Sequence, residues 1–181
     1  MDEGEPRVAI AIETPRLILR ELTLADVDIL AAMYADEEVM RFIGTGGVLG
    51  RDDAARSIER QLDSYRERGF GEWATVLRES GEMVGLCGLI VWPDIDGDEE
   101  LEVAYLLDRT AWGRGLGTEV AEAIRDRAAR ELGRERLVSC IYPENTASIR
   151  VAEKIGMRFE KRFEYHGAPV ALYAWSAARS G

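Results

Sequence analysis

Alternating glycines, Gly113, Gly115 and Gly117, lie in the run Trp112–Thr118. Glycine permits positive φ and lets a ligand approach the backbone closely. We expect a helix to follow this turn, and the positive end and free N–H groups of a helix attract anions. Arg114 can add charge-assisted hydrogen bonds to phosphate oxygens. The spacing therefore favours a pyrophosphate-binding turn, and a plain strand-to-helix turn is the alternative.

Two common phosphate-binding loops do not fit this turn. A Walker loop ends in Gly-Lys followed by Ser or Thr, and that ending is absent here. A dinucleotide-binding turn requires an acid at the end of the next strand. Glu144 stands nearest to that place, but it follows Pro143 and precedes an expected helix cap. A nucleotide-binding oxidoreductase is therefore disfavoured.

Two motifs resemble the GNAT superfamily of acetyltransferases. The run Tyr105–Leu107 followed by Trp112–Gly117 is similar to the acetyl-CoA motif of that superfamily. Farther along, Asn145–Ser148 and Glu153–Met157 together resemble its second signature. The superfamily usually has Gln or Arg where Trp112 stands, so one cation near the phosphates is missing.

A third motif narrows the resemblance to one branch. Thr14–Arg20 resembles the opening of the branch of ribosomal-protein N-terminal acetyltransferases called RimJ/RimL-like, and Glu102 also fits that branch. Trp is common at the position of Trp112 there. The resemblance covers the chain from about residue 13 to residue 175, and it is much less specific about the substrate than about the superfamily.

The resemblance implies an α/β (α+β) GNAT fold with a mixed, mostly antiparallel central sheet whose two central strands splay apart. Acetyl-CoA would enter that gap as co-substrate and pair with the backbone of the strand that ends at Leu107, since a strand edge offers free donors and acceptors. It assigns cofactor binding to Leu106, Leu107, Trp112, Gly113, Arg114, Gly115, Leu116, Gly117, Thr118 and Asn145.

Acetyl transfer from a thioester to an amine requires a base for the amine, donors for the oxyanion and an acid for the thiolate. Glu102 is the candidate base, because strand alternation places it with Ala104 and Leu106 on an apolar face that would raise the pKa of its carboxyl toward neutrality. A solvated acid at the strand end is the alternative. The family implies an oxyanion donor in the backbone N–H near Tyr105 or Leu106.

Ser148 is the candidate acid, and it lies one helical turn after Asn145, which can cap the helix or bond a pantetheine amide. Tyr142 is the alternative acid, because a phenol matches a thiolate better. Ordinary structural roles, a backbone-bonded helix Ser and a core aromatic, compete with both assignments. His166 lies in an expected turn beside Gly167 and receives no catalytic role.

These residues need elements to position them. Hydrophobic periodicity and turn residues predict one domain over residues 13–178, after a flexible tail over residues 1–12. Strands are expected over residues 17–21, 72–77, 83–91, 101–107, 137–142, 158–165 and 169–175. Helices are expected after Thr23, after Asp52 or Asp53, over residues 117–132 and over residues 145–155.

Composition limits the classes of function. The net charge of −11 argues against a nucleic-acid surface and suits cationic amines. Cys87 and Cys140 have no paired spacing, so neither a disulfide framework nor a metal site is expected. The acidic N-terminus lacks the pattern of a signal peptide, and a cytoplasmic protein without membrane association is expected. The sequence leaves a homodimer open.

The function predicted from the sequence is therefore an acetyl-CoA-dependent N-acetyltransferase. Its acceptor is a primary amine, either the α-amine of a protein N-terminus or a small molecule such as a polyamine, an amino acid or an antibiotic. A non-catalytic acyl-CoA-binding or sensing module on the same fold is the alternative from another class. Glu102 separates the two, because only the enzyme needs a base.

Overall fold

The computed structural model describes residues 9–177. Eight strands form one sheet in the order β1-β2-β3-β4-β5-β6-β8-β7, in which only β5 and β6 pair in parallel. The strands are β1 (Ile10–Glu13), β2 (Leu17–Arg20), β3 (Glu72–Leu77), β4 (Met83–Ile95), β5 (Asp98–Leu107), β6 (Arg136–Ile141), β7 (Arg158–Tyr165) and β8 (Ala168–Ser176). The mixed, mostly antiparallel fold predicted from the sequence is confirmed.

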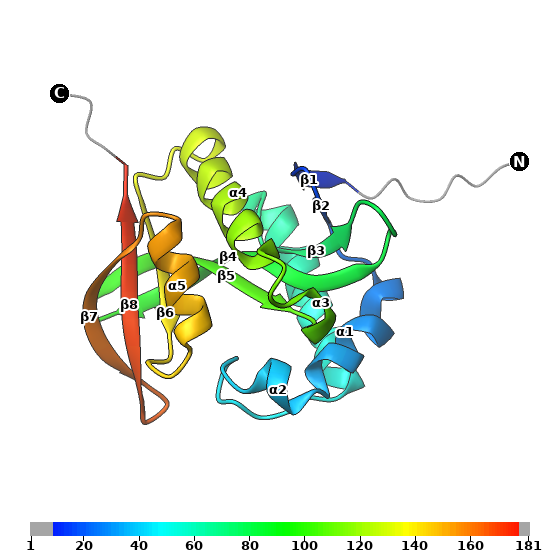
Figure 1. Ribbon diagram of the computed structural model, residues 1–181, viewed down its shortest axis with the longest axis horizontal. Coiled ribbons are helices and arrows are strands. Elements are labelled where there is room, and N and C mark those ends of the chain that lie inside the picture. The colour runs from blue at the N-terminus through cyan, green and yellow to red at the C-terminus, as the bar shows by residue number, and fades with distance from the viewer. Residues whose placement is uncertain (1–8, 178–181) are drawn as a thin grey trace, which may run out of the picture.

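The helices lie on both faces of the sheet (Figure 1). One face is covered by α4 and α5, and the other by α1, α2 and α3. Their bounds are α1 (Val27–Tyr34), α2 (Glu37–Met40), α3 (Arg51–Arg68), α4 (Leu116–Glu131) and α5 (Thr146–Lys154), and short 3₁₀ turns cover Leu24–Asp26 and Arg109–Ala111.

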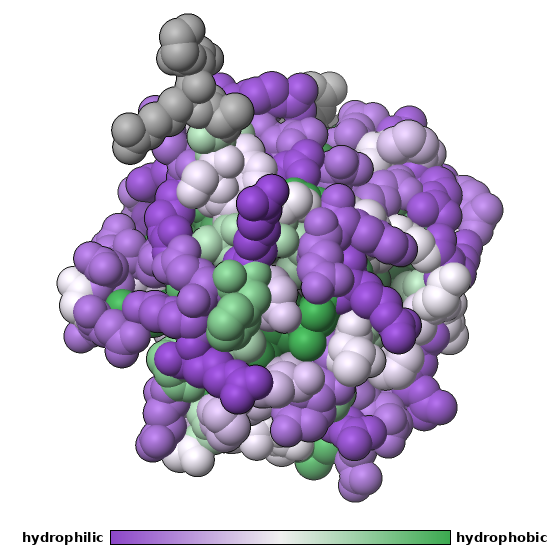
Figure 2. All heavy atoms as spheres, turned by 60° about the vertical axis from the view of Figure 1, so that its left-hand side comes forward, coloured by the Kyte–Doolittle hydropathy of each residue, from purple (hydrophilic) through white to green (hydrophobic). Residues whose placement is uncertain are grey.

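Amphipathic spacing explains these layers. Val120, Ile124 and Ala128 recur every fourth residue along α4, and all three are fully buried against the sheet. Leu30 of α1 and Ile58 of α3 are equally buried on the opposite face. Outside these contacts the surface is mostly hydrophilic, with a small hydrophobic patch near the centre of the face in Figure 2.

Among the expected boundaries that differ from the structure, three have a clear physical reason. Strand β1 lies in the range assigned to a flexible tail, because residues 10–13 pair with β2; the expectation for residues 1–8 lies outside the described residues. Helix α3 is capped at Gly50, since Asp53 accepts the Gly50 N–H from inside the first turn at 2.9 Å. Strand β4 runs through Pro93, where the ladder with β5 is irregular and a missing N–H costs no hydrogen bond.

No helix within residues 9–177 is long and apolar enough to cross a membrane.

Candidate functional site

The site begins where two central strands part. Strands β5 and β6 share a single register pair, Glu102 with Val138, whereas β4 accompanies β5 along its length. Beyond that pair the two strands diverge, and a cavity of about 590 Å³ opens between them. Pro143 lies two residues after the end of β6 and cannot donate to a continuing ladder. The splayed strands predicted from the sequence are therefore present.

Strand alternation decides which backbone groups face the gap. The Leu89 N–H donates to Gly71 at 3.0 Å, so the backbone of Leu89 faces β3 and that of its partner Val103 faces β6. The Ser139 hydroxyl indeed donates to the Val103 carbonyl at 2.9 Å. Two residues farther along β5, the Tyr105 N–H and C=O face the open gap.

The same alternation corrects one expected role. The backbone of Leu106 points to its partner Leu86 on β4, so it offers no edge to a cofactor. Of the two expected oxyanion donors, Tyr105 and Leu106, only Tyr105 is oriented toward the gap. The Leu107 carbonyl accepts the Trp112 indole N–H at 2.8 Å, which fixes the turn that follows.

The glycine turn has the backbone that the sequence predicts. Gly113 and Gly115 have φ of 71° and 75°, which is the left-handed region that favours glycine. Helix α4 starts at Leu116 with Gly115 as its N-cap and no side-chain cap. The N–H groups of its first turn therefore have no side-chain cap within the described residues, and such groups suit a phosphate. Arg114 instead contacts the Glu79 carboxylate at 3.3 Å, in a weak surface pair.

A group of hydrogen bonds behind this turn was not expected from the sequence. The Thr14 hydroxyl and the Arg16 backbone N–H both donate to Glu119 of α4, at 2.6 and 3.0 Å. The Arg16 guanidinium contacts the other Glu119 oxygen at 2.6 Å and the Arg114 carbonyl at 2.8 Å. The motif at residues 14–20 therefore anchors the start of α4, which its resemblance alone did not reveal.

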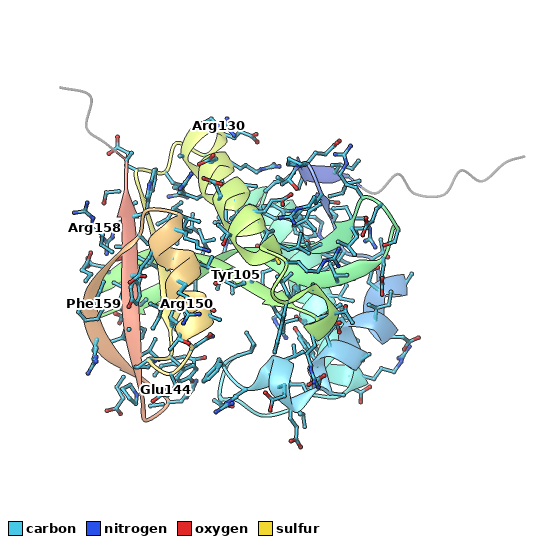
Figure 3. The ribbon with its side chains drawn as sticks, viewed as in Figure 1. Tyr105, Arg130, Glu144, Arg150, Arg158 and Phe159 are labelled. Atoms are coloured by element: carbon cyan, nitrogen blue, oxygen red, sulfur yellow. The ribbon has the colours of Figure 1, made fainter. Side chains whose placement is uncertain are left out.

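Helix α5 brings a second set of groups to the gap. Asn145 caps it, and its Oδ1 accepts the Ser148 N–H at 3.1 Å, as expected. Tyr105 lies between α4 and α5 (Figure 3), with a buried hydroxyl that makes no hydrogen bond within residues 9–177. Burial raises the pKa of Tyr105 to about 12, and the facing Ser148 hydroxyl partly lowers it, although the pair lies outside hydrogen-bond geometry.

Glu102 lies at the point of divergence and is 7% exposed. Its Oε2 accepts the Trp92 indole N–H at 2.6 Å, and its Oε1 accepts the Cys140 backbone N–H at 2.7 Å. Burial raises the pKa of Glu102 to about 7, against the lowering effect of these two donors. The direction is the one expected from the sequence, and the arrangement offers a fixed carboxylate able to take a proton near neutral pH.

Residues 16–158 match the sequence family described as acetyltransferase (GNAT) domain. The chain belongs to this family. It is accordingly an N-acetyltransferase by class. The uncharacterized protein YkkB of Bacillus subtilis is 38% identical over 88% of this chain and 92% of its own length. The uncharacterized N-acetyltransferase p20 of Bacillus licheniformis is 27% identical over 81% of this chain and 82% of its own length.

A solved structure supports the same assignment. The acetyltransferase from Agrobacterium tumefaciens str. C58 superposes with a TM-score of 0.78 at 28% identity, and the match covers 96% of this chain and all of that one.

Glu72 is a candidate site residue that the sequence did not indicate. It starts β3, lines the cavity and shares a face with Ala74 and Val76, so strand alternation placed an acid on an apolar face. Gln61 donates to Glu72 Oε2 at 2.9 Å and accepts the Glu72 N–H at 2.9 Å. Burial, and then the charge of Glu102, raise the pKa of Glu72 to about 7.

The remaining candidate residues line the outer part of the cavity between β5 and β6 or lie away from it. The Tyr142 hydroxyl donates to the Gly44 carbonyl at 2.6 Å, so its proton is engaged across the mouth of the cavity. Its role as an acid stays a prediction. His166 and Gly167 form the expected tight turn between β7 and β8, with φ of 49° and 80°. Within residues 9–177 no cluster of His, Cys, Asp or Glu could hold a metal ion.

Proposed function

We propose that this GNAT enzyme transfers the acetyl group of acetyl-CoA to a primary amine by direct attack in a ternary complex. One observation carries the proposal: the cavity between β5 and β6 holds Glu102, fixed by Trp92 and Cys140, at the end of the exposed Tyr105 edge. A base and a cofactor edge thus open into one space, which direct attack requires.

The residues present fit acetyl-CoA. The first-turn N–H groups of α4, Leu116 to Thr118, would bind the pyrophosphate, with Gly113 and Gly115 allowing its approach. The Tyr105 carbonyl would accept a hydrogen bond from a pantetheine amide, as it would from another strand. The unsatisfied Tyr105 hydroxyl would gain a partner at the thioester end beside Ser148. When bound, acetyl-CoA supplies the thioester carbonyl.

Groups of this chain can carry each proton transfer that the reaction requires. Glu102 takes one proton from the acceptor ammonium, and the neutral nitrogen forms the new N–C bond as the C–S bond breaks. The Tyr105 N–H is placed to stabilise the developing oxyanion. As the N–C bond forms, the nitrogen releases its second proton, and this proton reaches the departing sulfur through the hydroxyl of Ser148, or through that of Tyr142 if its bond to Gly44 opens, so the relaying hydroxyl ends the step protonated.

The competing functions differ in their use of Glu102. A non-catalytic acyl-CoA sensor needs no base, and a buried carboxylate with two fitted donors favours the enzyme. Membership of the RimJ/RimL-like branch, and with it a protein α-amine as acceptor, rests on the motif at residues 14–20. The cytoplasmic location and the homodimer stay predictions.

A thiol-release assay tests the proposal. The full chain is mixed with acetyl-CoA and a panel of small amines and N-terminal peptides, and free coenzyme A is measured. We expect release with one class of acceptor, accompanied by the acetylated product in mass spectrometry. Release at the rate of uncatalysed hydrolysis with every acceptor would contradict the proposal.

A further inference from the structure

One face of α3 forms the cavity wall that lies apart from α4 and α5. Its members recur at spacings of three and four residues, so they share one side of the helix. Ala54 and Ile58 of α3 pack under the sheet instead. The residues of this polar wall are Ser57, Arg60, Gln61, Ser64 and Arg68.

Most polar groups of this wall are already bonded. Ser57 pairs with the Tyr34 hydroxyl at 3.1 Å, and Ser64 donates to the Phe70 carbonyl at 2.8 Å. Gln61 uses both ends of its amide on Glu72. The polar groups of this wall that remain to be considered are therefore the guanidiniums of Arg60 and Arg68.

Arg60 and Arg68 make no ion pair or side-chain hydrogen bond with any residue from 9 to 177. Other arginines of the same helix are paired, since Arg56 contacts Asp53 at 2.6 Å and Arg66 contacts Asp63. The unpaired guanidiniums are the ones that line the cavity. A planar guanidinium binds a carboxylate through two parallel hydrogen bonds.

Two carboxylates line the same cavity. Glu102 and Glu72 both line it, and Glu72 Oε1 receives no hydrogen bond within the described residues. The positive charge of Arg60 opposes the rise in the pKa of Glu72, so the guanidinium and the carboxylate interact within this cavity. The acceptor space is thus bipolar, with carboxylates beside the sheet and guanidiniums along α3.

We propose that the acceptor is a small zwitterion whose amine lies between Glu72 and Glu102 and whose carboxylate is held by Arg60 and Arg68. This inference rests on the proposed function for its active site and adds the substrate class. A polyamine would bring a second cation against the guanidiniums. A protein N-terminus carries no free carboxylate close to its amine, so it leaves Arg60 and Arg68 without a counter-charge.

Binding tests the class separately from catalysis. Titration calorimetry on the full chain with coenzyme A present compares two matched pairs: 2,4-diaminobutyric acid with 1,3-diaminopropane, and lysine with cadaverine. Each pair differs by one carboxylate. We expect the acid to bind at least about tenfold more tightly than its decarboxylated partner, because a charge-assisted pair in a cavity is lost with the carboxylate.

Variants locate that preference on α3. Arg60→Gln and Arg68→Gln should each weaken binding of the preferred acid by about tenfold and leave the diamines unchanged or slightly tighter. Arg66→Gln is the matched control, since Arg66 lies on the same helix, is paired with Asp63 and has a side chain that is 72% exposed. It should leave both members of each pair unaffected.

Each outcome decides one question. Carboxylate-dependent binding that both Arg variants abolish supports the inference, even where thiol release fails and the proposed function falls. Equal or stronger binding of the diamines, binding of neither member of either pair, or a preference that survives both substitutions would overturn the zwitterion while leaving the acetyl transfer to stand on the thiol-release assay.

Discussion

Glu102 owes its position to two N–H donors from separate elements. Trp92 supplies one from β4, and Cys140 supplies the other from β6. Both favour the ionised carboxylate, whereas burial favours the neutral acid and prevails, so the pKa lies at about 7. A base balanced in this way responds to the loss of either donor.

Trp92→Phe should shift the pH dependence of the reaction. Without the indole donor the ionised form of Glu102 is less stable, so its pKa rises and the acidic limb of kcat/KM moves to higher pH. A net hydrogen-bond worth of about 0.5–1.5 kcal/mol corresponds to roughly 0.5–1 pH unit. Initial rates across pH measure it, with the KM for acetyl-CoA as control. If the acidic limb of kcat/KM stays at the same pH, Glu102 is not the group whose titration produces that limb.

Asn145 allows its two roles to be separated. Asn145→Ala should lower the free energy of unfolding by about 1 kcal/mol through loss of the cap on α5. Asn145→Asp keeps a capping oxygen and removes only the amide donor, so it should retain stability and raise the KM for acetyl-CoA. Chemical denaturation and steady-state rates measure the two effects. An unchanged KM in the Asp variant would leave Asn145 with the cap alone.

At this scale the sequence could indicate Glu102, because a motif and strand alternation both point to it. Glu72 obeys the same alternation but lies in no motif, and its partner Gln61 is on another element. Arg60 and Arg68 look like ordinary helix-surface cations until their lack of partners within residues 9–177 becomes visible. Such features depend on contacts between distant segments, which spacing within one segment does not encode.

At the scale of elements, the turn into α4 contains one glycine that needs a positive φ, Gly115, and one that does not, Gly117. Gly115 has φ of 75°, so any side chain there is strained, and a bulky substitution would add a larger strain to any block of the cofactor. Gly117 lies inside α4, where a Cβ would meet Val151, Leu107 and Tyr105 at 3.7–3.8 Å, an ordinary contact distance. The pair gives a matched comparison.

Gly115→Ala should cost roughly 1–2 kcal/mol of stability and weaken coenzyme A binding, because the N–H groups at the start of α4 lose their orientation. Gly117→Ala should gain up to about 1 kcal/mol from helix propensity and change coenzyme A affinity by only a few fold. Denaturation and calorimetric titration check both. Equal losses of coenzyme A affinity in the two variants would argue against a specific role for the turn.

Element types were predictable where one amphipathic period ran long enough, as in α4 and α3. Helix α2 escaped prediction because four residues carry too little periodicity, although Asp36 caps it with bonds to Glu38 and Val39. Strand β1 escaped because its support comes from pairing with β2. The parting of β5 from β6 followed from family resemblance, since no residue pattern specifies the register of two strands far apart in sequence.

At the scale of the whole molecule, the acidic site opposes stability at higher pH. Burial raises the pKa of Glu72 and of Glu102 to about 7 in the folded chain, from the ordinary value of 4.5 that applies in the unfolded chain. The folded state therefore holds more protons between these values, and the contribution of both groups to stability falls as the pH rises from about 4.5 through 7. A site arranged for proton transfer thus carries a cost in stability.

Glu72→Gln should accordingly raise the melting temperature at pH 8 and lose that advantage at pH 5. The glutamine oxygen can still accept from Gln61, so packing is largely preserved. Glu67→Gln, on the exposed side of α3, is the control and should show no such dependence. Thermal scans at the two pH values measure the difference. A larger stabilisation at pH 5 than at pH 8 would show that the ionised Glu72 carboxylate does not destabilise the fold.

The role of Glu102 as the base is tested most directly by a full kinetic comparison of wild type and Glu102→Gln across pH with a reactive amine. Loss of a positioned base lowers rates by roughly 10²–10⁴-fold, so kcat should fall within that range, the acidic limb should vanish, and coenzyme A affinity should stay nearly intact. If Glu102 only held the ammonium, KM for the amine would rise while kcat changed little. An unchanged kcat with its acidic limb retained would contradict Glu102 as the base.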